Sequence, residues 1–440
     1  MCFRKFIEKL DSENELIKIT KEVSADFEIA NILAALDGKA VKFEKVKGYN
    51  TPVIGGIVSS RDLIAKAIGC EKSEILKKMV HAMNNPTEPE MINENETAPC
   101  QEVVEEEVDL DKIPILFHME KDGGKYIPSA VCVIKDPELG RNACYHRLMQ
   151  IGKDKFSIRI IKNRGTDTAL QKGEGEMDIA ICIGNSVPVL LAAATSLPKG
   201  RDELSMANTL GKTRLVKCKT LDLEIPADCE LVLEGKVTKE THSEGPFLDL
   251  TETMDSRREN QPVVKIHKIT HRKDYMYQAL LPGKGEHKIL MGMPMEPSIF
   301  NEVNKVCECK NVLVTQGGCS WLHGIVQIAK KEIDDGKKAI NAAFEGHKSM
   351  KHCIVIDEDI DIYNPNEVEW AVSTRFQADK DSEIRLKQPG SSLDPSGIFE
   401  QGKKTLTCKV GIDATIPFGK KDKSFSKEHY KKINLDEYTR

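Results

Sequence analysis

The chain has 440 residues, and its 64 lysines and arginines stand against 69 aspartates and glutamates, so its formal net charge is −5. This length suggests two to three domains of roughly 100–200 residues, and an apolar fraction of about 45%, with glycine counted, excludes a largely disordered chain. The slight acidity argues against a nucleic-acid-binding protein, which usually carries a basic face.

The first hundred residues alternate short helical and strand-like patterns, which is typical of an α/β domain. Residues 27–36 illustrate the helical type, with Ile29, Ile32 and Leu33 at helical spacing. From residue 84 to 107 the composition shifts to asparagine, proline and glutamate, and we expect a linker and a domain boundary there. The predicted helices are 3–10, 27–36 and 61–68, and the predicted strands are 16–20, 41–46 and 52–58.

Residues 126–281 contain many short strand-like stretches, which indicate a β domain of barrel or sandwich type. Twenty uncharged residues, 179–198, are the one serious candidate for a membrane span. They contain Gly184, Asn185 and Pro188, so we expect a strand, a polar turn and a short helix instead. The predicted strands are 129–134, 156–161, 178–183, 215–220, 230–237, 263–271 and 275–281.

The last third of the chain returns to alternating helical and strand-like patterns, which are typical of an α/β domain. We expect the lysine-rich segment 419–440 to form a tail or a short helix. The predicted helices are 289–306, 321–344 and 366–376, and the predicted strands are 311–315 and 352–356.

Thirteen cysteines are spread along the chain, and the first residues resemble the start of an amphipathic helix rather than a signal peptide. We therefore expect a soluble cytoplasmic protein with free thiols and without membrane insertion. Cys307, Cys309 and Cys319 are the closest set, but a fourth metal ligand is missing. Packed thiols are the simpler interpretation.

Several polar residues carry candidate chemistry, although no P-loop, GxGxxG, HExxH or GxSxG motif is present. Three arginines fall within 18 positions, at 147, 159 and 164. Their planar guanidinium groups could bind a phosphate, or they could form ion pairs with acidic residues at the surface. Glu244 and Asp249 flank a Gly-Pro turn, either as a carboxylate pair for acid–base chemistry or as a turn alone. Asn142 and Glu203 carry hard oxygen donors that suit Mg²⁺ or Mn²⁺.

In chain order, these segments resemble the UbiD family of prenylated-FMN-dependent decarboxylases over roughly residues 1–420. The resemblance rests on the stretch from Asn142 to Arg147, the Gly-Lys-Asp-Lys strand ending in Arg159, Arg164-Gly165, the segment from Pro198 to Glu203, the Glu-Gly-Pro-Phe-Leu-Asp turn at 244–249, and the segments 355–361, 369–371, 374–375, 391–394 and 409–415.

The resemblance implies a role for each matching residue. Arg147, Glu244 and Asp249 match the catalytic network, with Asp249 as the proton donor. Asn142 and Glu203 match the ligands of a divalent metal, Mn²⁺, with K⁺ as a further candidate ion. The residues that match contacts to prenylated FMN are Tyr145, His146, Arg147, Arg159, Ile160, Ile161, Arg164, Gly165 and, from the C-terminal part, Lys409.

Two positions depart from the family pattern. Cys144 stands where many members have serine, which replaces a hydroxyl near the phosphate by a weaker donor. Asn163 precedes Arg164 where many members have histidine, so an imidazole linked to the metal is missing there. The metal's full ligand set is therefore left open.

The fold that the resemblance implies is an α/β multidomain protein. It has an N-terminal α/β domain (1–100), a central split β-barrel that binds the flavin (101–285) and a C-terminal α/β domain for dimerisation with its tail (286–440). The implied partners are a second copy of the chain, in a homodimer or higher homo-oligomer, and a flavin prenyltransferase that supplies the cofactor.

The implied reaction is the non-oxidative decarboxylation of an unsaturated acid, in which the cofactor acts as an electron sink. The archaeal anhydromevalonate phosphate decarboxylases are the most similar group, which suggests conversion of trans-anhydromevalonate 5-phosphate to isopentenyl phosphate in isoprenoid biosynthesis. Its substrate phosphate would need a second basic site, for which His242, Arg257 and Lys284 are candidates. The enzymatic alternative is an aromatic-acid decarboxylase of the 4-hydroxybenzoate type. Alternatives from other classes are a flavin-binding electron-transfer protein and a non-catalytic scaffold.

Overall fold

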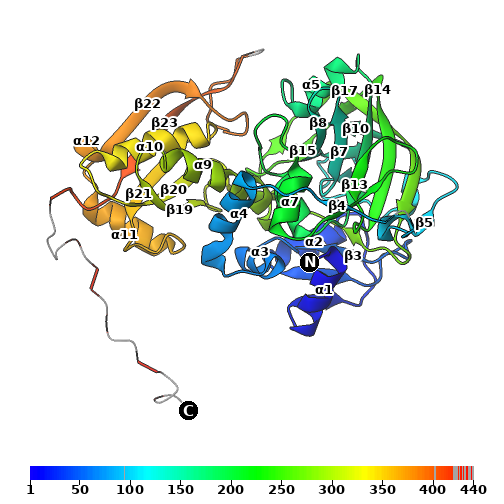
Figure 1. The fold of residues 1–440 in the computed structure, drawn as a ribbon, viewed down its shortest axis with the longest axis horizontal. Coiled ribbons are helices and arrows are strands. Elements are labelled where there is room, and N and C mark those ends of the chain that lie inside the picture. Colours follow the sequence, from blue (N-terminus) through cyan, green and yellow to red (C-terminus); the bar gives the residue numbers. More distant parts are fainter. Residues whose placement is uncertain are drawn as a thin grey trace. The chain divides into compact units, whose positions relative to one another are not determined.

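The computed structural model describes residues 1–93, 95–400, 403–419, 425, 427–428, 430, 433–434 and 438. The chain forms two compact units. The first contains Met1–Ser298, Val314–His323 and Ser392–Pro395, and the second contains Ile299–Leu313, Gly324–Ser391 and Ser396–Arg440. The predicted α/β multidomain fold is confirmed, with several separate sheets and flanking helices (Figure 1).

A small four-stranded sheet opens the first unit, in the order β1-β2-β3-β18. Its last strand, β18, follows the strands of the large central sheet in the chain and pairs in parallel with β3. The strands are β1 (Leu16–Ile19), β2 (Ala40–Phe43), β3 (Val53–Gly55) and β18 (Tyr277–Gln278), and the helices are α1 (Phe3–Ser12), α2 (Glu28–Ala35), α3 (Arg61–Ile68) and α4 (Ile75–Asn84).

The central part of the first unit is a nine-stranded sheet that is antiparallel at every strand pair described here. Its path runs β6-β9-β10-β17-β14-β11-β7-β8, and β5 pairs with β17; among the described strands the path has two open ends. The long strands β14 and β17 form its middle (Figure 1). The members are β5 (Val103–Val104), β6 (Tyr126–Ile127), β7 (Val131–Asp136), β8 (Gly140–Tyr145), β9 (Leu148–Gln150), β10 (Lys155–Ile158), β11 (Met177–Ile183), β14 (Leu231–Glu244) and β17 (Arg258–His271).

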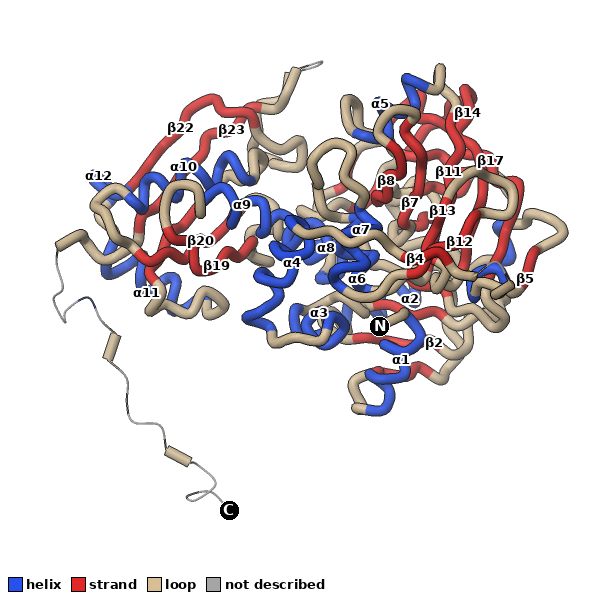
Figure 2. The backbone as a smooth tube through the Cα atoms, viewed as in Figure 1, coloured by secondary structure: helices blue, strands red, loops and turns tan. Residues whose placement is uncertain are grey.

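Shorter elements surround this sheet. A three-stranded sheet has the order β13-β12-β4, and β15 pairs with β16 directly after Glu244. Helices α3, α4, α6 and α7 pack together (Figure 2). The strands are β4 (Glu90–Met91), β12 (Arg214–Lys217), β13 (Glu224–Pro226), β15 (Phe247–Leu248) and β16 (Met254–Asp255), and the helices are α5 (Gly165–Lys172), α6 (Val187–Ala193), α7 (Glu203–Leu210) and α8 (Gly285–Gly292).

Strand β11 shows why the uncharged run 179–198 is part of the core. Ala180 and Cys182 point into a cluster that includes the apolar residues of α6 and α7. Ile179 and Ile181 point into a second cluster on the opposite face of the strand. A strand that is covered on both faces is apolar at every position, so no helix is required. None of the helices in the described part of the chain has the length and hydropathy of a membrane span.

The second unit contains a five-stranded sheet in the order β19-β20-β21-β23-β22. The predicted tail at 419–440 lies for the most part outside the described residues. The strands are β19 (Glu308–Val314), β20 (His323–Ala329), β21 (His352–Asp357), β22 (Ser382–Pro389) and β23 (Leu406–Asp413), and the helices are α10 (Asp335–Gly346), α11 (Pro365–Arg375) and α12 (Ala378–Asp381). Helix α9 (Glu296–Val303) begins in the first unit and ends in the second.

The predicted helix 321–344 is wrong in its first half. This half forms β20, and only the second half forms a helix, α10. Ile325, Val326 and Ile328 are buried in the strand, and β-branched residues fit a pleated sheet better than a helix. The predicted helix 289–306 is also interrupted, because Pro294 lies in a short 3₁₀ turn between α8 and α9.

Candidate active site

Arg147 is the centre of a group of charged side chains between β8 and β9. Its Nε and Nη2 donate to the two carboxylate oxygens of Glu244, each at 2.9 Å. Nη2 also donates to Asp255 Oδ2 at 2.8 Å, and Nη1 lies 3.6 Å from Asp249 Oδ2. Burial acts to lower the pKa of Arg147, but the hydrogen bond and charge of Glu244 and the charge of Asp255 raise it overall. One guanidinium group therefore gathers three carboxylates.

Of these three carboxylates, Asp249 has the weakest contacts to arginine. Glu244 is fully buried and binds Arg147 through both oxygens. Asp255 accepts hydrogen bonds at 2.8 Å from two arginines, 147 and 258. Asp249 contacts Arg147 only at 3.6 Å, and its side chain is 17% exposed. Of the three, Asp249 is therefore the carboxylate least engaged by arginine, although its Oδ1 accepts the N–H of Leu250 at 2.7 Å.

Asn142 and Glu203 come together at the start of α7, as the metal assignment requires. Asn142 Nδ2 lies 3.5 Å from Glu203 Oε2, which also accepts the N–H of Ala143 at 2.9 Å. Gly165 lies beside them, because a Cβ atom there would be 2.7 Å from Asn142 Oδ1. Arg141 donates to Asp202 at the N-cap of α7 and so helps to hold Glu203 against β8.

Glu203 is partly buried, and the charge of Arg141 offsets only part of its desolvation. Desolvation raises the pKa of Glu203 to about 7, and the charge of Asp202 adds to this effect. A divalent ion between Glu203 and Asn142 would relieve this cost, because both side chains offer hard oxygen ligands. Their chemistry and proximity therefore fit a divalent metal.

His146 and Cys144 form a short hydrogen-bonded chain near these residues. His146 Nδ1 lies 3.0 Å from the carbonyl of Arg159, so Nδ1 carries a proton and Nε2 accepts from Thr166 Oγ1 at 2.8 Å. Burial lowers the pKa of His146, which favours this neutral form. Cys144 Sγ lies 3.3 Å from the same hydroxyl, so the thiol fits as its donor. Asn163, the other departure, lies exposed in the turn before α5.

The remaining residues of the first unit that are assigned to the cofactor lie at the end of β8 and in the segment between β10 and α5, and they differ in exposure. Arg159 has no acidic partner within the described residues, and burial and the charges of Arg258 and Arg147 lower its pKa. The Tyr145 hydroxyl is buried with no hydrogen-bond partner in the described structure. Ile160 is buried, whereas Ile161 and Arg164 are exposed.

A guanidinium group without an ion-pair partner among the described residues, at Arg159, and a buried hydroxyl without a hydrogen-bond partner there, at Tyr145, are groups that a phosphate-bearing flavin could bind. The described residues therefore fit both the flavin and the metal that the family resemblance implies.

Lys409 lies in the second unit, on β23. Its side chain is buried, its Nζ donates to the carbonyl of Lys348 at 2.6 Å, and it lies 5.1 Å from the centre of the Phe344 ring. Burial lowers the pKa of Lys409 to about 8. Its assignment to the cofactor stays a prediction.

Two of the residues considered for a second phosphate site are already paired. Arg257 binds Glu259, and Lys284 binds Glu252 at 3.2 Å. His242 is exposed, and its Nδ1 lies 2.7 Å from the Ser243 carbonyl.

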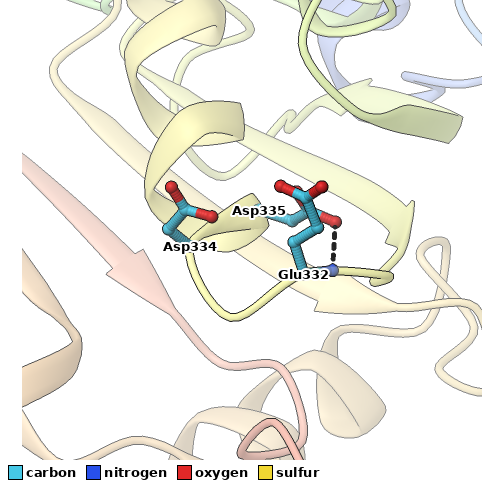
Figure 3. Close-up of side chains that lie close together, drawn as sticks. All are labelled: Glu332, Asp334 and Asp335. Carbon is cyan, nitrogen blue, oxygen red and sulfur yellow. Dashed lines mark hydrogen bonds between the residues drawn. The ribbon is translucent and has the colours of Figure 1, made fainter.

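Glu332, Asp334 and Asp335 form the one group of three metal-type side chains found within 4.8 Å of one another in the described residues (Figure 3). Lys338 pairs with all three, and Asp335 accepts the backbone N–H groups of Lys331 and Glu332. The three carboxylates therefore have partners at the start of α10 that explain their proximity without a metal ion.

The cysteines form no such group of three in the part of the chain described. All thirteen are free, Cys309 is buried, and Cys307 and Cys319 are partly buried. The predicted free thiols are therefore present, and the electron-transfer alternative loses the metal site that those thiols would have supplied.

Three residues near the catalytic group were not anticipated. Tyr126 donates to Glu244 at 3.0 Å, and Asp255 binds Arg147. His287 on α8 accepts the N–H of Gly283 at its Nδ1, and burial lowers its pKa while the charge of Asp249 opposes this shift. No local motif marks these three side chains, because the fold alone brings them to the site.

Comparisons with known proteins identify relatives of the whole chain. Three models of 3-octaprenyl-4-hydroxybenzoate carboxy-lyase match the chain: the N-terminal domain at residues 7–83, the Rift-related domain at 92–285 and the C-terminal domain at 288–414. An anhydromevalonate phosphate decarboxylase of Methanothermobacter thermautotrophicus is 41% identical over 96% of this chain and 98% of its own. The enzyme of the same name from Methanosarcina mazei is 40% identical over 94% and 96%.

A solved structure gives the same result for the fold. The UbiD-class enzyme HmfF from Pelotomaculum thermopropionicum, in complex with FMN, has a TM-score of 0.94 and 35% identity and covers all of both chains. An evolved dimeric form of that enzyme, in complex with prFMN, has a TM-score of 0.89 and 34% identity, again over both whole chains. The chain described here therefore belongs to the UbiD family of carboxy-lyases.

Proposed function

We propose that this protein is a prenylated-FMN-dependent decarboxylase that converts trans-anhydromevalonate 5-phosphate to isopentenyl phosphate. The observation that carries the proposal is the arrangement around Arg147, which binds Glu244 and Asp255 at 2.8–2.9 Å and lies 3.6 Å from Asp249. Loss of CO₂ from an unsaturated carbon leaves a carbanion that must be protonated, and this arrangement offers a proton donor.

The chain's own residues supply orientation and electrostatics. When bound, prenylated FMN supplies the electron sink for the charge that CO₂ leaves behind. Arg147 orients the carboxylates around it, because it is buried and binds both oxygens of Glu244. Asp249 gives a proton to the carbon from which CO₂ has departed.

Cofactor binding is assigned to the residues around β8 and α5. Asn142 and Glu203 would hold Mn²⁺, and Arg159 with the buried hydroxyl of Tyr145 would face the flavin. The support is the partly buried Glu203 carboxylate, whose raised pKa a divalent ion would correct, and the lack of an acidic partner for Arg159 within the described residues.

The choice of substrate is supported by relatives. Five proteins that carry the name anhydromevalonate phosphate decarboxylase are 33–41% identical to this chain over 84–96% of its length. We also propose a cytoplasmic homodimer or higher homo-oligomer, with a flavin prenyltransferase as the source of the cofactor. A dimeric form of a UbiD-class neighbour supports the first part.

The test uses protein produced together with a flavin prenyltransferase. CO₂ release is measured with trans-anhydromevalonate 5-phosphate, with its dephosphorylated analogue and with 4-hydroxybenzoate, and the apoprotein is the control. We expect the highest kcat/KM for the phosphorylated acid, with kcat as well as affinity reduced for the analogue, because binding energy at the remote phosphate helps to position the alkene. Comparable kcat/KM for the first two acids, or a preference for 4-hydroxybenzoate, would contradict the substrate assignment.

A further inference from the structure

The turn that carries Glu244 and Asp249 rests on the segment just before β6. The N–H of Gly123 donates to the carbonyl of Pro246 at 2.7 Å, and a Cβ atom at position 123 would lie 2.3 Å from the carbonyl oxygen of Gly245. The Leu248 N–H donates to Asp122 Oδ1 at 3.3 Å. The two segments are therefore in direct backbone contact, and glycine at 123 permits this approach.

Tyr126 is the side chain through which this segment reaches the catalytic group. It is fully buried, and its ring centre lies 4.5 Å from that of Phe247. Its hydroxyl donates to Glu244 Oε1 at 3.0 Å and accepts the N–H of Gly245 at 3.0 Å. Burial and the charge of Glu244 raise the pKa of Tyr126, so the hydroxyl keeps its proton. Both hydrogen-bonding capacities of this hydroxyl are thus directed at the catalytic turn.

Glu244 Oε1 is the point at which two donors meet. It accepts from Arg147 Nε at 2.9 Å and from the Tyr126 hydroxyl, while Oε2 accepts from Arg147 Nη2. A carboxylate held only by the guanidinium could rotate together with it, whereas a donor from a second element fixes the plane of both groups. Tyr126, acting on Glu244, and Asp255, which accepts from Arg147 Nη2 at 2.8 Å, together set the orientation of Arg147 toward Asp249.

We propose that Tyr126 is a positioning residue of the reaction, whose hydroxyl fixes the Glu244 carboxylate and thereby holds Arg147 in its orientation toward Asp249. This inference rests on the proposed decarboxylation, since the positioning serves that chemistry. Tyr126 acts through Glu244 and does not itself exchange the proton.

Tyr126→Phe removes the hydroxyl and keeps the ring against Phe247. Tyr277→Phe is the matched control, because Tyr277 is also fully buried and its hydroxyl has no hydrogen-bond partner in the described structure. In the holoenzyme we expect Tyr126→Phe to lower kcat about tenfold with KM within about twofold. Flavin occupancy should be unchanged, and Tyr277→Phe should match the wild type. An unchanged kcat, or a raised KM with unchanged kcat, would overturn the proposal.

A double-variant comparison separates positioning from general destabilisation. If Tyr126 acts through Glu244, adding Tyr126→Phe to Glu244→Gln should lower kcat by less than about twofold further. A full tenfold further loss would overturn the proposal. Should Tyr126→Phe fail to fold, ring-fluorinated tyrosines at position 126 keep the shape and vary the donor strength. In that series kcat should change at least about threefold at constant KM, and a constant kcat would count against the proposal.

Wild-type turnover distinguishes the two possible failures. If the wild-type holoenzyme decarboxylates none of the three acids, the proposed function fails, and the inference fails with it. If the wild type is active and Tyr126→Phe is equally active, only the role of Tyr126 is rejected.

Discussion

Replacing Arg147 by methionine tests the electrostatics of the catalytic group. Methionine keeps an unbranched chain but removes the charge, so the fully buried Glu244 loses the partner that binds both of its oxygens. Removing one member of a buried ion pair typically costs about 3–5 kcal/mol, because the remaining charge is left uncompensated. Asp255 keeps a second arginine, Arg258, so the cost comes mainly from Glu244. For a unit of this size we expect the melting temperature to fall by about 10 °C.

Two controls accompany this variant in chemical denaturation. Adding Glu244→Gln to Arg147→Met removes the stranded charge, and we expect it to recover about 2 kcal/mol of the free energy of unfolding. Lys135→Met breaks an exposed ion pair with Asp222 and should leave the free energy of unfolding close to that of the wild type. A loss below about 1 kcal/mol for Arg147→Met, or a double variant less stable than the single one, would refute this account of the site.

Two further predictions concern groups whose pKa is shifted. Glu203→Gln should reduce Mn²⁺ and flavin occupancy together in equilibrium dialysis. In the wild type, the affinity for Mn²⁺ should fall as the pH drops below about 7, because burial raises the pKa of Glu203 to about 7 and a proton then competes with the metal. Unchanged occupancy in the variant would count against the metal assignment. Burial lowers the pKa of Lys409 to about 8, so between pH 7 and 10 the unfolded chain binds more protons than the folded one. The free energy of unfolding of the wild type should therefore rise by about 1 kcal/mol over this range, and Lys409→Met should remove the rise. Identical pH profiles for the free energy of unfolding of wild type and variant would reject this reasoning.

Local patterns predicted much of the fold. Helix α3 has the predicted bounds, 61–68, and the structure shows why it ends there: Ser60 caps its first turn, and Gly69 ends it in a left-handed conformation. The strand, turn and helix of 179–198 were also predicted, since Gly184 and Pro188 interrupt the apolar run. Strand β20 was missed because an apolar run next to a helix has no distinctive period of its own.

The candidate site also contains residues that the sequence predicts and residues that it does not. Arg147, Glu244 and Asp249 lie in segments with a recognisable sequence, and the structure brings them together. Tyr126 and Asp255 meet the same group across 118 and 108 positions of the chain, in segments without a motif. Only the pairing of distant strands places such residues, so a sequence pattern could not have predicted them.

The most direct test of the central claim is turnover and cofactor occupancy measured on one preparation of Asp249→Asn. Asparagine has almost the shape of aspartate, and the Asp249 side chain is partly exposed with one distant ion pair, so packing and flavin binding should survive. The amide cannot act as the proton donor. We predict flavin and metal contents equal to those of the wild type, with steady-state decarboxylation of trans-anhydromevalonate 5-phosphate reduced at least about 100-fold. Substantial steady-state decarboxylation by the variant would contradict the role given to Asp249.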